Sequence, residues 1–433
     1  MLDLIQDALL TFKGIIRYHS LLKKSQFWNS EQKLSYQKKH LSILLKHAFR
    51  NVPWYSNIQK KYDIRPNSIN PFNELKKLPI LSKSDVRNNH ADFCVPHASK
   101  NSLTFSTSGT TGEPLSVYTS KNQWILEQGI IWRSWKWAGY RFRDKVAIFR
   151  SYAPGKDKTK IKKDFLRNWS YFSVFDMDDD SMDKYFDYLI KWKPKFLRGY
   201  PSALLLVAEY ALKNNVKLPH LKGIFTASEV VHDIQRDKLK EAFGVNVFDH
   251  YGQAEITCMF HECEIHEGMH IDSEYGYVEL LPSSSEGLYK IIATNLHNLS
   301  MPLLRYDTGD LSDGTFIECG CKKGLKLKKI HGRNDDYIIK KDNSKISTIN
   351  LYTYFAKLDY INKFQMQQNS KGTLEIILKF DSNIDKPNQD IKKEFIKSDL
   401  SEKTGLDIII SSEKSLYQSS EGKLPSFIQN IRS

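Results

Sequence analysis

A stretch rich in hydroxyl groups and glycine, TFSTSGTTGEPLSVY at residues 104–118, is the part of the sequence best suited to chemistry. Gly109 and Gly112 permit backbone angles that other residues disfavour, and they let main-chain N–H groups approach an anion closely. Hydroxyl donors come from Ser106, Thr107, Ser108 and Thr110. The pattern predicts a loop that holds the phosphates of a nucleotide. The alternative is a flexible Ser/Gly linker.

This loop differs from the best-known phosphate-binding pattern, because no G-x-x-x-x-G-K-[ST] sequence can be written in it. Leu115, Val117 and Tyr118 after it alternate as in a strand. We therefore expect the loop to connect two strands.

An aromatic residue and an acid follow a second apolar stretch at residues 245–250. Tyr251 and Gly252 form a turn that exposes an aromatic face, and Glu255 lies four residues beyond the tyrosine. Because Mg²⁺ prefers carboxylate and phosphate oxygens, Glu255 is a candidate ligand for it. The alternative is a surface glutamate beside a core tyrosine.

Two short-spaced pairs of metal-binding residue types form a separate group. They are Cys263 with His266, and Cys319 with Cys321. Three thiolates and an imidazole can close a structural, tetrahedral Zn²⁺ site. His261 and His270 compete for the fourth position, and Cys258 is a further thiol. Buried free cysteines are the alternative; an odd total of five argues against a disulfide framework.

The elements that must position these residues follow an α/β pattern. Apolar strands at 145–151, 196–202 and 223–229 alternate with helical stretches, which predicts a parallel or mixed sheet. Polar residues at the carboxyl ends of such strands are where open sheets bind ligands. After residue 274 the chain becomes rich in strands, and a compact tail follows residue 341.

Composition restricts the partners. The 64 Lys and Arg against 50 Asp and Glu give a net charge of +14, which favours acidic partners such as nucleotides and coenzyme A. No RNA-binding signature, zinc-finger pair or arginine stripe is present, so we expect no nucleic-acid partner.

The N-terminal residues 2–16 have apolar side chains at helical spacing, and no apolar run is long enough to span a bilayer. We expect this amphipathic helix to pack on its own domain, with peripheral membrane contact as the alternative. No secretory signal is recognisable, and we expect a cytoplasmic protein.

Six motifs occur in order: STSGTTGEPLSV, TASE, YGQAE, LLRYDTGDL, GRNDDYI and GKLPSF. This set resembles the adenylate-forming superfamily of acyl-CoA synthetases and adenylation domains. More narrowly it resembles the phenylacetate-CoA ligase family, including its capsular-polysaccharide-biosynthesis branch, as do HAFRNVPWY and LPILSKSDVR. The resemblance covers nearly the whole chain. It implies an α/β fold with a large multi-sheet N-terminal domain and a small, mobile α+β C-terminal domain.

The resemblance also implies an activity. Family members activate a carboxylic acid with ATP and Mg²⁺ to give an acyl-adenylate and pyrophosphate, and then transfer the acyl group. The acceptor is coenzyme A, or an amine or hydroxyl such as that of a sugar in capsular or surface polysaccharide synthesis. The alternative function is a catalytically inactive nucleotide-binding or membrane-associated scaffold.

The resemblance also implies roles for individual residues, according to their positions in the family motifs. The phosphate loop corresponds to Ser106, Thr107, Ser108, Gly109, Thr110, Thr111 and Gly112. The adenine-stacking tyrosine corresponds to Tyr251, with Gly252 and Gln253 beside it, and Glu255 corresponds to the Mg²⁺ ligand. Ser228 and Glu229 match the motif beside the adenine and acyl pocket.

Four further residues carry predicted roles. Asp310 corresponds to the carboxylate that holds both ribose hydroxyls, Arg333 to an arginine near the α-phosphate, and Asp335 to the hinge. Lys423 corresponds to the mobile catalytic lysine; read without the resemblance it would be a solvated surface residue. Leu115 departs from the pattern, because many members of the superfamily have a lysine at this position.

We therefore predict two domains. Residues 1–334 form the adenylation domain, with a helical lead-in at 1–100 and a zinc-bound element at about 258–322. Residues 335–433 form the mobile C-terminal domain, because residues 334–336, Asn-Asp-Asp, supply turn chemistry between the two.

Overall fold

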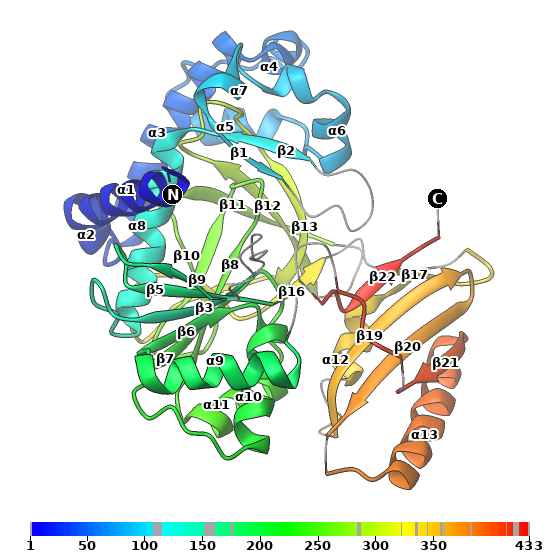
Figure 1. The fold of residues 1–433 in the computed structure, drawn as a ribbon. Helices are drawn as coiled ribbons and strands as arrows, with labels where there is room; N and C mark the ends of the chain where they lie inside the picture. The colour runs from blue at the N-terminus through cyan, green and yellow to red at the C-terminus, as the bar shows by residue number, and fades with distance from the viewer. Residues whose placement is uncertain are drawn as a thin grey trace. The chain divides into compact units, whose positions relative to one another are not determined.

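The computed structural model describes residues 2–106, 115–150, 161–174, 177–283, 287–321, 323–333, 337–343, 345–355, 358, 360–381, 383–412, 414–418 and 424–431. The chain, whose ribbon is drawn in Figure 1, divides into two compact units by its internal contacts. The first comprises Met1–Asp144, Asp164–Arg167 and Phe248–His331, and the second comprises Lys145–Lys163, Asn168–Val247 and Gly332–Ser433. The domain boundary near residue 335 stays a prediction.

The first unit begins with a run of helices. They are α1 (Leu2–Arg17), η1 (Tyr18–Leu22), α2 (Lys23–Ser25), α3 (Ser30–Asn51), α4 (Pro53–Ile58), α5 (Pro71–Lys77), α6 (Lys83–Asn88), η2 (His90–Phe93) and α7 (Ala98–Asn101). Local chemistry sets several of their starts. Ser82 caps α6 in a reciprocal capping box with Asp85, and Pro53 occupies the first turn of α4.

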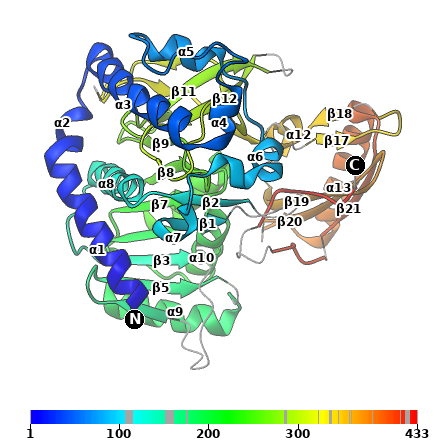
Figure 2. The same ribbon diagram turned by 90° about the horizontal axis from the view of Figure 1, so that it is seen from above.

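Two helices of this unit cross at glycines. Helix α1 lies beside α8 (Lys121–Trp137) (Figure 2). A Cβ atom on Gly129 would lie 2.8 Å from the main-chain oxygen of Gly14, so only glycine permits this approach. The amphipathic helix predicted at the N-terminus is thus confirmed, and it packs on its own unit. Its outward Leu9 and Ile16 remain exposed.

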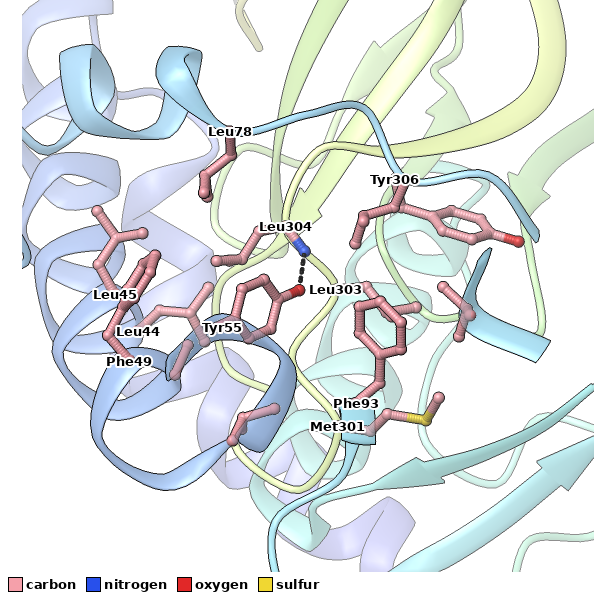
Figure 3. Packing of buried hydrophobic residues seen from close by; sticks show 14 of the residues in the cluster. Leu44, Leu45, Phe49, Tyr55, Leu78, Phe93, Met301, Leu303, Leu304 and Tyr306 are labelled. Carbon is pink, nitrogen blue, oxygen red and sulfur yellow. Dashed lines mark hydrogen bonds between the residues drawn. The ribbon is translucent and has the colours of Figure 1, made fainter. Parts of the chain in front are cut away.

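A hydrophobic core joins the helical lead-in to the segment before β13 (Tyr306–Asp313) (Figure 3). Leu44, Leu45 and Phe49 of α3 pack in the same cluster as Leu303, Leu304 and Tyr306. The buried hydroxyl of Tyr55 donates to the carbonyl of Pro302 at 2.9 Å and accepts from the N–H of Leu304 at 3.1 Å. This core fixes where the predicted motif LLRYDTGDL enters its strand.

The strands of the first unit form three groups. A hairpin pairs β1 (Leu103–Ser106) with β2 (Ser116–Thr119), and a second sheet has the order β11-β12-β13-β16, in which β12 pairs antiparallel with both β11 and β13. The third group has the order β14-β15-β10-β9-β8. The remaining bounds are β8 (Val247–Gly252), β9 (Met259–Glu262), β10 (Met269–Ile271), β11 (Gly276–Pro282), β12 (Leu288–Asn295), β14 (Phe316–Ile317), β15 (Lys326–Leu327) and β16 (Ile330–Arg333).

The second unit contains the predicted parallel strands. Their order is β7-β6-β3-β5-β4, and β7, β6, β3 and β5 pair in parallel. The bounds are β3 (Val146–Arg150), β4 (Ile161–Asp164), β5 (Trp169–Ser173), β6 (Phe196–Gly199) and β7 (Gly223–Ala227). Helices α9 (Asp179–Trp192), α10 (Pro201–Lys213) and α11 (Asp233–Phe243) pack against them through one buried apolar cluster.

The tail of the chain belongs to the second unit and has α+β architecture, as predicted. Its main sheet has the order β21-β20-β19-β22 and is accompanied by the pair β17-β18. The bounds are β17 (Tyr337–Ile339), β18 (Lys345–Ser347), α12 (Thr348–Phe355), β19 (Ile361–Ser370), β20 (Thr373–Phe380), α13 (Lys386–Thr404), β21 (Asp407–Ser411) and β22 (Phe427–Gln429). In the part of the chain that the structure describes, no helix has both the length and the apolar character needed to cross a bilayer.

Candidate nucleotide and metal sites

Two residues predicted to hold a nucleotide lie in direct contact. The hydroxyl of Tyr251, on β8, donates a hydrogen bond to Oδ2 of Asp310, on β13, at 2.6 Å. Burial and the neighbouring carboxylate raise the pKa of Tyr251 well above its ordinary value, so its phenol stays protonated at neutral pH. The two residues predicted to contact adenine and ribose are therefore neighbours in the structure.

Glu255, the predicted Mg²⁺ ligand, is buried beside the same strand. Its Oε1 accepts a hydrogen bond from the hydroxyl of Tyr306 at 2.9 Å and lies 3.5 Å from Nζ of Lys83. Among the described residues Oε2 of Glu255 makes no hydrogen bond. The next residue, Ile256, has φ of +56°, which is strained for a β-branched side chain. Such strain often accompanies functional sites, and here it follows the carboxylate directly.

Main-chain bonds hold the strand that carries Asp310 and Tyr306 against the segment before α6. The N–H of Leu81 donates to the carbonyl of Arg305 at 3.0 Å, and the N–H of Asp307 donates to the carbonyl of Leu81 at 2.8 Å. Lys83, two residues after Leu81, is thereby placed beside Glu255.

The predicted phosphate loop is described only at its edge. Ser106 ends β1, is exposed, and pairs with Ser116 at the start of β2. The hairpin predicted around the loop is confirmed. The other loop positions lie outside the described residues; they are Thr107, Ser108, Gly109, Thr110, Thr111 and Gly112.

Ser228 and Glu229 follow β7 in the second unit. Ser228 has φ of +73°, a left-handed conformation that is unusual for serine. Glu229 accepts from the main-chain N–H and from the hydroxyl of Ser202, each at 3.0 Å. It thus caps the first turn of α10, whose own cap residue Tyr200 makes no side-chain cap. A structural role accounts for these bonds, and nucleotide contact by Glu229 stays a prediction.

Of the three residues with predicted roles near the domain boundary and the C-terminus, the structure describes one. Arg333 ends β16, while Asp335 and Lys423 lie outside the described residues. Leu424, which follows Lys423, donates its main-chain N–H to Oε1 of Glu229 at 3.3 Å.

Four metal-binding side chains converge in the first unit. Ligand atoms of Cys263, His270, Cys319 and Cys321 all lie within 4.8 Å of one another. The two sulfur atoms of Cys263 and Cys319 are 3.7 Å apart, and Nε2 of His270 is 3.1 Å from Sγ of Cys321. Zn–S bonds near 2.3 Å in a tetrahedron place sulfurs about 3.8 Å apart, so the residues fit Zn²⁺. Burial lowers the pKa of His270 to about 4, so its ring is neutral and able to bind metal at pH 7.

The fourth member of this group differs from the residue that the spacing favoured. The group contains His270 and not His266. Nδ1 of His266 lies 3.7 Å from Oε2 of Glu262, and its ring packs on Phe248. The reason is strand pairing: β10 pairs with both β9 and β15, which carries His270 to the turn that holds Cys319 and Cys321.

His261 and Cys258 are excluded from the metal group. Nδ1 of His261 is 2.5 Å from Oδ2 of Asp272, and that carboxylate also accepts from Arg133 at 2.6 Å. Cys258 is buried beside Gln253, with its sulfur 3.7 Å from Nε2 of the amide.

Sequence reasoning missed Lys83 and Tyr306 as members of the Glu255 site. Tyr306 lies within the motif LLRYDTGDL and Lys83 within LPILSKSDVR, so both motifs were recognised without a role for these residues. An aromatic hydroxyl between two acidic motifs was the available signal for Tyr306. No sequence pattern indicated Lys83, because it is the β-bridge between Leu81 and Tyr306 that brings Lys83 to Glu255.

Comparison with known proteins places the chain among its relatives. No family model matches the sequence. Protein CapK of Staphylococcus aureus is 26% identical over 405 residues, covering 89% of this chain and 88% of that protein. Phenylacetate-coenzyme A ligase of Pseudomonas putida is 28% identical over 318 residues, covering 70% of this chain and 71% of that enzyme.

Solved structures agree on the fold. A 2-hydroxyisobutyryl-CoA ligase in the post-adenylation state superposes with a TM-score of 0.72 at 16% identity, covering 93% of this chain and 90% of that chain. The chain is therefore a homologue of CapK and of the phenylacetate-CoA ligases, and it has the fold of the adenylate-forming CoA ligases.

Proposed function

We propose that the protein is an ATP-dependent ligase that converts a carboxylic acid to an acyl-adenylate and then transfers the acyl group to coenzyme A. One observation carries the proposal: Tyr251, Asp310 and Glu255 converge within one unit of the chain. The homologues named phenylacetate-coenzyme A ligase support it.

The chemistry explains why such a site is needed. A carboxylate is a poor electrophile, because oxide would have to leave. Attack of a carboxylate oxygen on the α-phosphorus of ATP forms a new P–O bond and releases pyrophosphate, which leaves the acyl group attached to AMP. Coenzyme A then attacks the acyl carbon through its sulfur, and AMP departs.

The described residues supply binding and orientation. Oδ2 of Asp310 is held by Tyr251, so the carboxylate is fixed in direction. Two carboxylate oxygens suit the two hydroxyls of a ribose. The ring of Tyr251, which packs on Phe260 at a centroid distance of 5.3 Å, offers an aromatic surface to a base.

Glu255 would hold Mg²⁺ with the nucleotide phosphates. Its buried carboxylate has one oxygen occupied by Tyr306 and Lys83, and Oε2 has no partner among the described residues. Bound Mg²⁺ would neutralise negative charge on the phosphates. Roles for Arg333 and Lys423, and for the loop 107–112, stay predictions from the resemblance.

The Cys/His group is proposed as a structural zinc site. Three cysteines and His270 fill a tetrahedron and leave no open position for catalysis. The site would tie β10 to the turn at Cys319 and Cys321.

The acceptor is the finer part of the proposal. Coenzyme A is favoured by the ligases among the homologues, and an amine or hydroxyl of a sugar in capsular or surface polysaccharide synthesis stays a prediction. Incubating the enzyme with ATP, an activated acid and each acceptor class, followed by mass spectrometry of the product, decides between them. Acyl-CoA formation supports the proposal, and an exclusive amide or ester product contradicts its second half.

Formation of the acyl-adenylate is tested by the exchange of labelled pyrophosphate into ATP in the presence of aryl, amino and hydroxy acids. The proposal predicts exchange with at least one acid. ATP binding without exchange, for every acid class, would support an inactive nucleotide-binding protein instead.

A further inference from the structure

A lysine lies beside the carboxylate that we assign to Mg²⁺. Nζ of Lys83 is 3.5 Å from Oε1 of Glu255, and the two side chains are 27% and 9% exposed. Tyr306 donates to the same oxygen. The ammonium group of Lys83 is therefore directed at the proposed nucleotide site.

The segment that carries Lys83 is fixed at both ends. Its start is bonded to β13 through Leu81, which is bridged to Tyr306. At its far end, Nε2 of His90 lies 2.7 Å from the carbonyl oxygen of Ser116, the first residue of β2. Lys83 is thus held between the strand of Asp310 and the hairpin β1-β2.

A second cationic side chain lies on the same face of α6 as Lys83. Lys83 and Arg87 are one turn apart and share a face of the helix. Two like charges at this spacing repel each other and destabilise an isolated helix. Nε of Arg87 is buried and has no hydrogen-bond partner among the described residues. A lysine beside Glu255 and an arginine one helical turn further along suit an anion that carries several charges, such as a polyphosphate.

The position that holds a lysine in many members of the superfamily cannot provide this charge. Leu115 is 1% exposed and packs in the core of the first unit with Val117 and Leu304. Charge on the leaving pyrophosphate is then left to Mg²⁺, main-chain dipoles and other basic residues.

We propose that Lys83 is one of these basic residues and binds the pyrophosphate portion of MgATP. The inference rests on the proposed function of the same site. In the structure Lys83 pairs with Glu255. Glu255 would hold the metal ion of MgATP, and the flexible stem of Lys83 would let its ammonium group reach the phosphate oxygens.

The test compares two lysine-to-methionine variants. Lys83→Met removes the charge and keeps the length, and Lys83→Arg restores the charge. Lys77→Met is the matched control, because Lys77 pairs with a buried carboxylate of Glu74 at 2.9 Å, with side chains 38% and 7% exposed. Each variant is assayed for MgATP affinity by calorimetry, for the pyrophosphate KM in exchange, and for Tm.

We expect Lys83→Met to weaken MgATP and pyrophosphate about tenfold or more while leaving the KM for the acid within about twofold. Lys83→Arg should recover part of the loss, and Lys77→Met should bind as the wild type does. A folded Lys83→Met protein with wild-type affinities for both MgATP and pyrophosphate overturns the inference.

A second measurement uses the wild-type protein and needs no variant to fold. Amine-reactive labelling followed by mass spectrometry should show that pyrophosphate protects Lys83 and leaves Lys77 unchanged. Equal labelling of Lys83 with and without pyrophosphate contradicts the inference.

The two proposals fail in distinguishable ways. If the wild type binds MgATP through Lys83 and exchanges no pyrophosphate with any acid, the proposed reaction is wrong and the role of Lys83 stands. If the wild type exchanges and Lys83→Met matches it, the role of Lys83 alone is wrong. A wild type that binds neither MgATP nor pyrophosphate contradicts both.

Discussion

The phenolic oxygen of Tyr251 lies 2.6 Å from Oδ2 of Asp310, although 59 positions separate the two residues in the sequence. Strands β8 and β13 thereby present an aromatic ring and a carboxylate at one place. Because the bond fixes one carboxylate oxygen, Asp310 has a defined orientation before any ligand arrives. Pre-orientation of this kind lowers the entropic cost of binding.

The first prediction concerns this pair. Tyr251→Phe keeps the ring and removes the hydrogen bond, so we expect MgATP affinity to fall about fivefold, equivalent to about 1 kcal/mol. Asp310→Ala removes the ribose acceptor and should weaken MgATP more than about tenfold. Fluorescence or calorimetric titration of MgATP measures both. Wild-type affinity in folded Asp310→Ala protein would mean that this carboxylate does not contact the nucleotide.

The second prediction concerns the metal group. Purified protein should contain about one zinc per chain, measured by elemental analysis, because the four ligand atoms fit a tetrahedron. His270→Ala and Cys319→Ser should each lose the metal and lower Tm. His266→Ala is the matched control and should keep it, since His266 lies outside the group. Zinc that is lost from His266→Ala and kept by His270→Ala would reverse the assignment.

The third prediction concerns a buried charge network in the first unit. Arg133 is 3% exposed and donates to Asp272 at 2.6 Å and to Glu274 at 2.7 Å. Burial opposes its charge, but these two carboxylates outweigh burial and raise the pKa of Arg133. Arg133→Met would remove the cation that both buried carboxylates share, leaving Asp272 with His261 and Glu274 with the hydroxyl of Ser25, so we expect a loss of about 3–5 kcal/mol in the free energy of unfolding.

Urea unfolding measures that loss. Arg65→Met removes an exposed pair with Asp63, whose side chains are 73% and 76% exposed, and should change the free energy of unfolding by less than about 1 kcal/mol. Equal stability of the two variants would show that the Arg133 network contributes little.

The fourth prediction concerns pH. Burial and nearby positive charge lower the pKa of His297 to about 3 and that of His40 to about 4. Since both folded-state values lie below the ordinary 6.5, the folded protein binds fewer protons than the unfolded chain. Stability is then complete above pH 6.5 and falls as pH drops from 6.5 towards 3.

Urea unfolding at pH 7.5 and pH 5 tests this sign. His297→Gln should have a smaller difference between the two pH values than the wild type has, and His19→Gln on the surface should match the wild type. A wild type that is equally stable at both pH values contradicts the prediction.

Much of the architecture could be predicted from the sequence, because periodicity and local chemistry determine it. The alternating strands at 145–229 and the capped helices have apolar residues at spacings that reveal their type. The pairing of Tyr251 with Asp310 could be anticipated only through the family motifs, since no local pattern tells which strands become neighbours.

The parts that could not be predicted depend on pairing between distant strands. His270 enters the metal group because β10 lies between β9 and β15, whereas short spacing favoured His266. Lys83 reaches Glu255 because Leu81 bridges to Tyr306. Glu229 caps α10 because the turn after β7 brings it to Ser202, a contact that the motif TASE does not reveal.

The central claim is that this site joins a carboxylic acid to AMP. Exchange of labelled pyrophosphate into ATP, measured with the wild type and with Asp310→Ala across a panel of acids, tests it most directly. The account predicts exchange that requires both Mg²⁺ and one class of acid and that is largely lost in Asp310→Ala. Wild-type protein that binds MgATP yet gives no exchange with any acid, or exchange that Asp310→Ala leaves unchanged, would contradict it.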